Sequence, residues 1–135
     1  MFRYETVVRM RDTDAAGVMF FAGVLVVAHE CYEAFLEGRQ MSLGAMLADG
    51  QYLVPIVHVE ADIRKSMRLS ERITVAMSLA KAGKSSFELA YQFVNAEGEE
   101  TAKVKTVHAL VDAASRKSVR IPDELMATLK ELGTQ

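Results

Sequence analysis

The sequence has little of three features that often mark a protein's environment or partners. Only one cysteine, Cys31, occurs among the 135 residues. No disulfide can therefore form within the chain, and a reducing compartment is expected. The net charge is −2, which argues against nucleic-acid binding because phosphate recognition needs a basic face. These deficits favour a cytoplasmic protein that binds no nucleic acid.

Long apolar runs and targeting signals are also missing. The longest apolar stretch, Val18 to Ala28, is about half of the roughly 20 residues that span a bilayer. The start of the chain, Met1 to Glu5, lacks the basic-then-apolar order of a signal peptide. No repeat, low-complexity segment or long linker interrupts the sequence. We therefore expect a single domain over residues 1–135 and no membrane partner.

Hydrophobic periodicity predicts one long helix followed by a run of strands. Apolar residues recur at spacings of three and four from Phe21 to about Glu37, and the first half of this segment is apolar around most of its circumference. Strands are expected at 2–10, 52–64, 72–80, 86–94 and 101–111, and shorter helices at 42–48 and 123–132. Short turns between strands favour antiparallel pairing. The expected fold is α+β, a curved antiparallel sheet of about five strands wrapped around one long helix.

The segment from Arg11 to Val18 is the most informative for function. It carries two aspartates and a glycine, which by themselves are common turn residues. Asp14, however, lies just before the start of the predicted buried helix at Phe21. The first N–H groups of a helix have no intrahelical partner and can polarise a carbonyl oxygen. A nearby carboxylate can attack that carbonyl or activate a water, so the pattern favours acyl hydrolysis.

The run Asp12-Thr13-Asp14-Ala15-Ala16-Gly17-Val18-Met19-Phe20-Phe21 resembles the signature of hotdog-fold thioesterases of the 4-hydroxybenzoyl-CoA thioesterase type. The similarity continues through 55–57, the 83–87 turn and 121–122, so it covers nearly the whole chain. The helix entry at 20–22, the segment 29–33 and Pro55-Ile56-Val57-His58 are most similar to 1,4-dihydroxy-2-naphthoyl-CoA thioesterases of phylloquinone and menaquinone synthesis. Relatives often have asparagine at the position of Gly23 and tyrosine at that of Val24.

This resemblance implies a role for each matching residue. Asp14 would be the nucleophile or general base, and the backbone N–H of Phe21 would polarise the thioester carbonyl. Gly17 would allow a close approach of backbone and substrate. His29 occupies the position that faces the acyl group, and it would pair with a phenolic hydroxyl. The remaining implied contacts are His58 near the substrate and a basic set for the CoA phosphates, namely Lys84, Arg116 and Arg120, with Lys117 beside them.

Structural roles compete with several of these assignments. His29 and His58 are otherwise read as a core or interface histidine and as a strand histidine bonded to backbone, and the basic residues as solvated surface charges. His29-Glu30 superficially matches a zinc-protease pattern, but Glu33 stands where the second histidine is needed. Cys31 diverges from His29 on a helix and is expected to be buried and inert. We expect no metal and no redox cofactor.

Three functional hypotheses follow. The first is an acyl-CoA thioesterase that works as a homo-oligomer, a dimer or a tetramer built as a dimer of dimers, with CoA bound across a subunit interface. Dihydroxynaphthoyl-CoA is the preferred substrate, followed by hydroxybenzoyl and short-chain acyl-CoA or acyl-carrier thioesters. The second is a non-catalytic module that binds acyl thioesters. The third, a hydratase or dehydratase, would need Asp14 paired in space with His29 or His58.

Overall fold

The structure is a computed structural model that describes residues 1–41 and 49–134. Its elements in chain order are β1 (Phe2–Val7), the 3-10 turn η1 (Met10–Asp12), α1 (Phe21–Gly38), β2 (Tyr52–Leu53), β3 (Ile56–Ile63), β4 (Arg72–Ala82), β5 (Ser86–Asn95), β6 (Glu100–Ala109), β7 (Val111–Asp112) and α3 (Asp123–Lys130). The short helix expected at 42–48 lies outside the described residues. No helix in the described part of the chain is long and apolar enough to cross a membrane.

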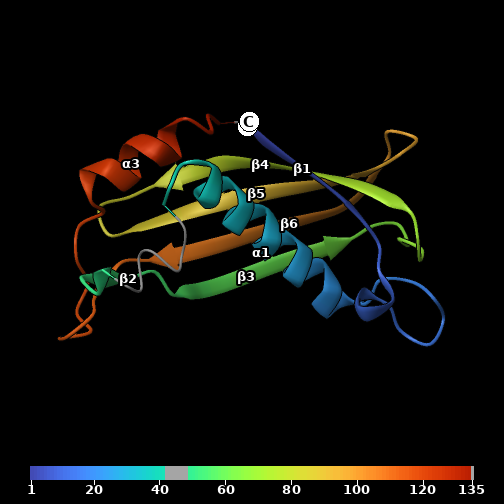
Figure 1. Ribbon diagram of the computed structural model, residues 1–135, viewed down its shortest axis with the longest axis horizontal. Coiled ribbons are helices and arrows are strands. Elements are labelled where there is room, and N and C mark those ends of the chain that lie inside the picture. The colour runs from blue at the N-terminus through green and yellow to red at the C-terminus, as the bar shows by residue number, and fades with distance from the viewer. Residues whose placement is uncertain (42–48, 135) are drawn as a thin grey trace.

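Five strands form one sheet in the order β1-β4-β5-β6-β3, and every neighbouring pair is antiparallel. Register shifts interrupt the β3–β6, β4–β5 and β5–β6 pairs, and such bulges bend a sheet. Figure 1 shows α1 lying across one face of this sheet, with α3 beside the end of β4. The predicted α+β hotdog architecture, a curved antiparallel sheet around one long helix, is confirmed.

The core lies between α1 and the sheet face that it covers. Residues of β5 alternate between buried and half-buried along the whole strand, so one face points inward. On α1, Val24, Phe35 and Leu36 are buried almost completely. Each such side chain contributes roughly 1.5–3 kcal/mol relative to exposure. Packing against the sheet therefore stabilises this largely apolar helix.

Two predicted strands prove to be divided. The strand expected at 52–64 breaks at Val54-Pro55, because β2 pairs with β7 in a separate two-stranded sheet while β3 pairs with β6. Pro55 has no N–H to donate, and its carbonyl accepts from the Ala109 N–H at 2.9 Å. The strand expected at 101–111 likewise ends at Ala109 before β7 begins.

The two ends of the sheet carry different groups of the site residues expected from the sequence. At the first, the loop after β1 meets the start of β4, since Val7 pairs with Arg72; we call this the Asp14 end. At the second lies the turn between β4 and β5, which carries Lys84; we call this the Lys84 end. Figure 1 shows them at the right and left of the molecule. The 11 residues of β4 separate them by about 35 Å at roughly 3.3 Å per residue.

Candidate active site

Asp14 sits in a tight turn with its carboxylate partly held. The Asp14 N–H donates to the Val18 carbonyl at 3.0 Å, and the Gly17 N–H donates to the Asp14 carbonyl at 3.1 Å. One carboxylate oxygen, Oδ1, accepts from the Ala16 N–H at 2.8 Å. The residue is exposed to solvent. The carboxylate is therefore oriented by the backbone, and its second oxygen has no hydrogen-bond partner among the described residues.

Gly17 gives this turn its shape. Its φ of +75° lies in the left-handed region, where residues with a side chain are strained, and a Cβ there would meet nothing within 4 Å. The glycine is thus required by backbone conformation rather than by crowding within the protomer. Its expected contact with substrate stays a prediction.

The Asp14 turn is tied directly to the start of α1. Thr13 and Met19 form an isolated antiparallel bridge at its neck. The Met19 N–H donates to the Met67 carbonyl at 2.7 Å, and the Phe20 N–H donates to the Asp12 carbonyl at 3.1 Å. Asp14 and the first residue of α1 are consequently held on the same end of the sheet, although seven positions separate them in sequence.

The N-terminus of α1 has open donors. The N-cap residue Phe20 makes no side-chain cap hydrogen bond, and no acidic residue occupies the first turn. Its carbonyl accepts from the N–H groups of Gly23 and Val24 at 2.9 and 3.3 Å. Among the described residues, no backbone carbonyl outside the helix accepts from the N–H of Phe21 or Ala22. These two donors, with the partial positive charge of the helix end, suit an oxyanion.

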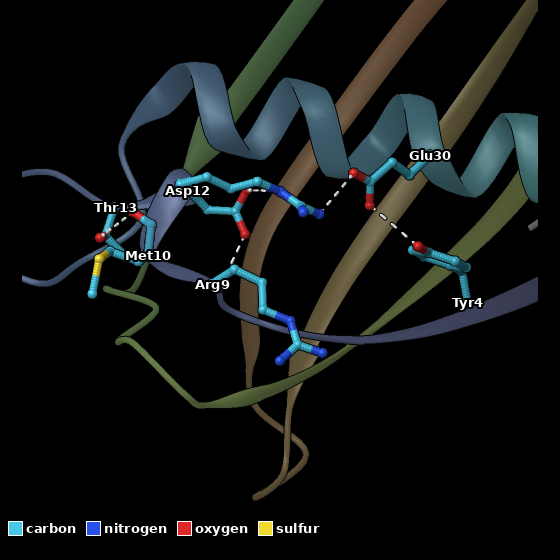
Figure 2. A network of polar contacts seen from close by, with 7 residues as sticks. Tyr4, Arg9, Met10, Asp12, Thr13 and Glu30 are labelled. Atoms are coloured by element: carbon cyan, nitrogen blue, oxygen red, sulfur yellow. Dashed lines mark hydrogen bonds and ion pairs between the residues drawn. The ribbon is translucent and has the colours of Figure 1, made fainter.

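A polar network braces the segment just before Asp14 (Figure 2). The Asp12 carboxylate is buried, accepts from the Arg9 N–H at 3.0 Å and pairs with Arg11 at 3.7 Å. Arg11 also bonds Glu30 of α1 at 3.4 Å, and the Tyr4 hydroxyl of β1 donates to Glu30 at 3.2 Å. Burial, together with the Glu30 charge, raises the pKa of Tyr4. The network joins β1, the Asp14 loop and α1 into one support.

His29 lies on α1 about 12 Å along the helix axis from Phe21, at 1.5 Å per residue. Its Nε2 is 3.1 Å from a carboxylate oxygen of Glu33, and its side chain is 38% exposed. Its ring lies 5.7 Å from the Tyr32 ring, which in turn lies 4.6 Å from the ring of His108 on β6. His29 therefore borders the side of α1 that faces β6, and its partly exposed side chain is accessible to a ligand.

Beneath His29 lies a buried polar cluster that the sequence analysis did not assign to the site. The His108 ring stacks on Phe87 at 4.7 Å, and its Nε2 bonds the Thr106 hydroxyl at 2.7 Å, which bonds the Tyr91 hydroxyl at 3.0 Å. Desolvation, with the charge of His29 as the smaller cause, lowers the pKa of His108 to about 4. Within the described residues, neither His108 Nδ1 nor the Tyr32 hydroxyl has a hydrogen-bond partner. Strand alternation with Val104 and Thr106 was the one available signal for an inward His108.

His58 lies away from this group within one protomer. Its Nε2 is 3.6 Å from Glu60, which is 3.9 Å from Lys105, itself paired with Glu88 at 3.0 Å. Glu88 alternates along β5 with buried residues that face α1, so these side chains lie on the opposite, outer face of the sheet. The structure does not bring His58 together with Asp14 or His29 in the described chain. Its substrate role stays a prediction.

The basic residues gather at the Lys84 end. The Lys84 carbonyl accepts from the Ile121 N–H at 2.9 Å, which brings Lys84 beside Arg120. Arg120 pairs with Asp123 at 3.6 Å and is largely exposed. Arg116 sits in the nearby turn with a φ of 62°. Within one protomer this basic set lies at the opposite end of the sheet from Asp14, a separation that sequence spacing did not reveal.

The described residues give no support to a zinc site or to Cys31 as a nucleophile. Across residues 1–41 and 49–134, no three His, Cys, Asp or Glu side chains are grouped to hold a metal ion. Burial raises the pKa of the Cys31 thiol to about 12, so this cysteine remains a protonated, buried thiol. The expectation that the protein works without a metal or cofactor stays a prediction.

The sequence and the fold are similar to those of known thioesterases. The thioesterase-like superfamily matches residues 8–129. A 1,4-dihydroxy-2-naphthoyl-CoA hydrolase from Nostoc punctiforme is 36% identical over 129 residues, covering 96% of this chain and 86% of the relative. One from Gloeothece citriformis is 35% identical, with 99% and 95% covered. The crystal structure of a 1,4-dihydroxy-2-naphthoyl-CoA thioesterase from Synechocystis superposes with a TM-score of 0.92 at 28% identity, covering 99% of this chain and 98% of that one.

The chain belongs to the thioesterase-like superfamily. The resemblance to hotdog-fold thioesterases that the Asp14 motif carries is confirmed, as is the prediction of a thioester hydrolase. The individual roles of Asp14, Gly17, Phe21, His29 and the basic residues are not tested by these similarities.

Proposed function

We propose that this protein hydrolyses an aromatic acyl-CoA thioester and that 1,4-dihydroxy-2-naphthoyl-CoA is its preferred substrate. The observation that carries the proposal is the joining of the Asp14 turn to an uncapped helix N-terminus through the Thr13–Met19 bridge and the Phe20–Asp12 hydrogen bond. The choice of acyl group rests on the relatives from Nostoc punctiforme and Gloeothece citriformis, which are named as hydrolases of this CoA ester. Hydroxybenzoyl and short-chain acyl-CoA or acyl-carrier esters are the alternative substrates.

In the proposed reaction, the N–H of Phe21 donates to the thioester carbonyl oxygen and stabilises the negative charge that develops there. Asp14 either takes a proton from water, which then attacks the carbonyl carbon, or attacks that carbon itself. In the second route water hydrolyses the resulting anhydride. By both routes the C–S bond breaks, the thiolate of CoA takes up a proton, and the acyl group leaves as a carboxylic acid. A burst of CoA release before steady state would indicate the covalent route.

His29 is proposed to contact the acyl group. It is half-exposed, it borders the side of α1 facing β6, and its ring lies 5.7 Å from the Tyr32 ring. An imidazole beside an aromatic wall suits a planar ring that carries a hydroxyl group, because stacking and a hydrogen bond can act together. A bicyclic dihydroxy acyl group has both properties. A straight acyl chain has neither, so His29→Leu should lower the preference for the hydroxylated substrate.

The decisive experiment measures thiol release from a panel of CoA esters: dihydroxynaphthoyl, hydroxybenzoyl, phenylacetyl and straight-chain acyl groups. Wild type is compared with Asp14→Asn and with Glu97→Gln, a matched control at an exposed carboxylate in the β5–β6 turn. We expect preference for the bicyclic ester, a loss of roughly 10² or more in kcat for Asp14→Asn, and no change for the control. Binding without cleavage would instead favour a non-catalytic binding module. An Asp14→Asn variant as fast as wild type would refute the catalytic role of Asp14.

A homodimer formed through β3 is part of this proposal. Among the described residues the strand pairs only with β6, which leaves its other edge open, and all eight of its residues are exposed. Val57 and Val59 are 60% and 41% exposed, which is unusual for an unpaired edge. Strand β3 also exposes Ile56 and Ile63 beside its charged Glu60 and Asp62, whereas β1, the other edge strand, exposes no large apolar side chain. The edge of β3 is therefore the one suited to a second copy.

Antiparallel pairing of β3 with its copy would reverse the strand direction across a twofold axis. The Lys84 end of one protomer would then lie beside the Asp14 end of the other. Lys84, Arg116 and Arg120 would face the CoA phosphates of a thioester whose carbonyl meets Asp14 of the neighbouring protomer. Assembly of two such dimers into a tetramer is compatible with this arrangement. The mechanism needs no metal or redox cofactor, and we propose that it operates in the cytoplasm.

Subunit complementation tests the shared site. Asp14→Asn and the double variant Lys84→Glu/Arg120→Glu are each expected to be poorly active at low substrate. After unfolding and refolding together, mixed dimers would contain one intact site, and about a quarter of wild-type activity should return. Refolding each variant alone is the control. No recovery, in mixtures in which native electrophoresis resolves the mixed dimer by its intermediate charge, would mean that each protomer holds its own complete site.

A further inference from the structure

The start of α1 touches the chain before Asp14 so closely that only a glycine fits. A Cβ built on Gly23 would lie 2.7 Å from the carbonyl oxygen of Asp12, 3.3 Å from its Cα and 3.1 Å from Cγ of Met19. Ordinary van der Waals contact begins at 3.4 Å, so the Asp12 backbone would have to move by about 0.7 Å to admit a methyl group. The obstructing atoms are mainly backbone, which cannot rotate away like a side chain.

The Asp12 carbonyl that lies against Gly23 also helps to hold the Asp14 loop in place. The Asp12 carbonyl accepts from the Phe20 N–H at 3.1 Å, and this bond closes the loop that carries Asp14. The Asp12 carboxylate is buried and bound by the Arg9 N–H. Asp12 therefore cannot move without shifting the neck of the Asp14 turn. Gly23 thus sets the distance between that turn and the open N–H groups of Phe21 and Ala22.

We infer that Gly23 is a positioning residue: its missing side chain lets the first turn of α1 rest on the Asp12 carbonyl and so fixes Asp14 relative to the helix N-terminus. The inference rests on the proposed function of Asp14. A misplacement of about 1 Å between reacting groups can lower a rate by on the order of 10²-fold. A shift of 0.7 Å should therefore be visible in kcat, with little change in KM because the CoA-binding residues lie elsewhere.

Gly23→Ala is the test, and Gly38→Ala is its matched control. Both glycines lie in α1, and a Cβ at Gly38 would meet nothing within 4 Å. We expect Gly23→Ala to lower kcat at least tenfold and Gly38→Ala to leave it unchanged. In an Asp14→Asn background, Gly23→Ala should change the residual rate by less than about twofold, because the group that it misplaces is already gone. A merely structural role would lower both rates by the same factor.

Amide hydrogen exchange of the Phe20 N–H gives a readout that needs no activity. Exchange should become faster in Gly23→Ala and stay as in wild type in Gly38→Ala. An unchanged kcat, equal losses in both backgrounds, or unchanged exchange at Phe20 would overturn the inference. If wild type and Gly38→Ala cleave no ester, the proposed function has failed, and Phe20 exchange still decides whether Gly23 holds the loop.

Asp12→Ala and Asp12→Asn test the same contact if Gly23→Ala does not fold. The alanine variant frees the Arg9 N–H and loosens Asp12, so kcat should fall with the same dependence on Asp14. The asparagine variant keeps an oxygen that can accept from the Arg9 N–H, and it should recover most of the activity. If Asp12→Asn were no more active than Asp12→Ala, the proposed positioning would be contradicted.

Discussion

His108 should make the stability of this protein depend on pH in a defined window. The imidazole has no exposed surface, and desolvation lowers its pKa to about 4 from the ordinary 6.5. The folded state therefore keeps the ring neutral at pH values where the unfolded chain already binds a proton. Because the unfolded state binds more protons between these two values, the free energy of unfolding falls as the pH drops from about 6.5 toward 4.

The expected magnitude follows from the two pKa values. A shift from 6.5 to about 4 corresponds to about 3 kcal/mol once the pH is below both values. At pH 5, where the unfolded chain is almost fully protonated at this residue, the loss is about 2 kcal/mol. Above pH 7 the contribution disappears. A loss of this size is a large fraction of the roughly 5–15 kcal/mol by which domains are stable.

Urea unfolding of wild type and His108→Gln between pH 4.5 and pH 8, at one fixed protein concentration, isolates the effect. Glutamine does not titrate, and its amide can still bond the Thr106 hydroxyl. We expect the difference in unfolding free energy between the two proteins to change by about 2 kcal/mol in favour of the variant from pH 8 to pH 5. If the two pH profiles stay parallel, His108 is protonated in place in the folded protein, and the description of it as a buried neutral ring is wrong.

Three further perturbations test other parts of the structure. Tyr32→Phe removes a buried hydroxyl that has no partner in the described residues. It should raise the free energy of unfolding, measured in urea, by about 1 kcal/mol. A clear destabilisation would mean that a ligand or water bonds this hydroxyl. Arg116 has a left-handed φ of 62°, so Arg116→Gly should stabilise the fold by up to about 1 kcal/mol. The same variant should raise KM for CoA esters. Arg116→Ala should raise KM without that stabilisation. Cys31, whose thiol has its pKa raised by burial to about 12, should react with Ellman's reagent only after unfolding, and fast labelling of the native protein would refute its burial.

Local patterns predicted most of the secondary structure because the signals are carried by neighbouring residues. The inward alternation of β5 and the apolar periodicity of α1 are visible in a few turns of sequence, and both elements begin where expected. The break at Val54-Pro55 was missed because apolar residues continue on both sides of it. The pairing of β1 with β4 joins segments far apart in the chain, and no local pattern records such a contact.

The site was predictable only in part for the same reason. The Asp14 turn precedes α1 directly in sequence, so the motif and the helix start could be read together. The cluster of Tyr32, His108 and Phe87 joins α1 to two strands, and each residue alone reads as ordinary core. Gly23 was visible in the sequence as a departure from relatives. That its missing side chain admits the Asp12 carbonyl became clear only from the structure, in which a Cβ at Gly23 would lie 2.7 Å from that carbonyl oxygen.

The separation of Asp14 from the basic residues links the fold to the assembly. Within one protomer, Lys84 and Arg120 lie about 35 Å from the Asp14 end along β4, so one chain does not juxtapose its own proposed acyl and phosphate contacts. The open edge of β3 runs between these two ends, and its valines are exposed, whereas β1 exposes no large apolar side chain. Twofold pairing along β3 would bring each basic cluster to a carboxylate on the other chain. The open edge of β3 and the divided site are then explained by a single contact. A variant that keeps β3 from pairing with its copy should lose thioesterase activity while its monomer stays folded.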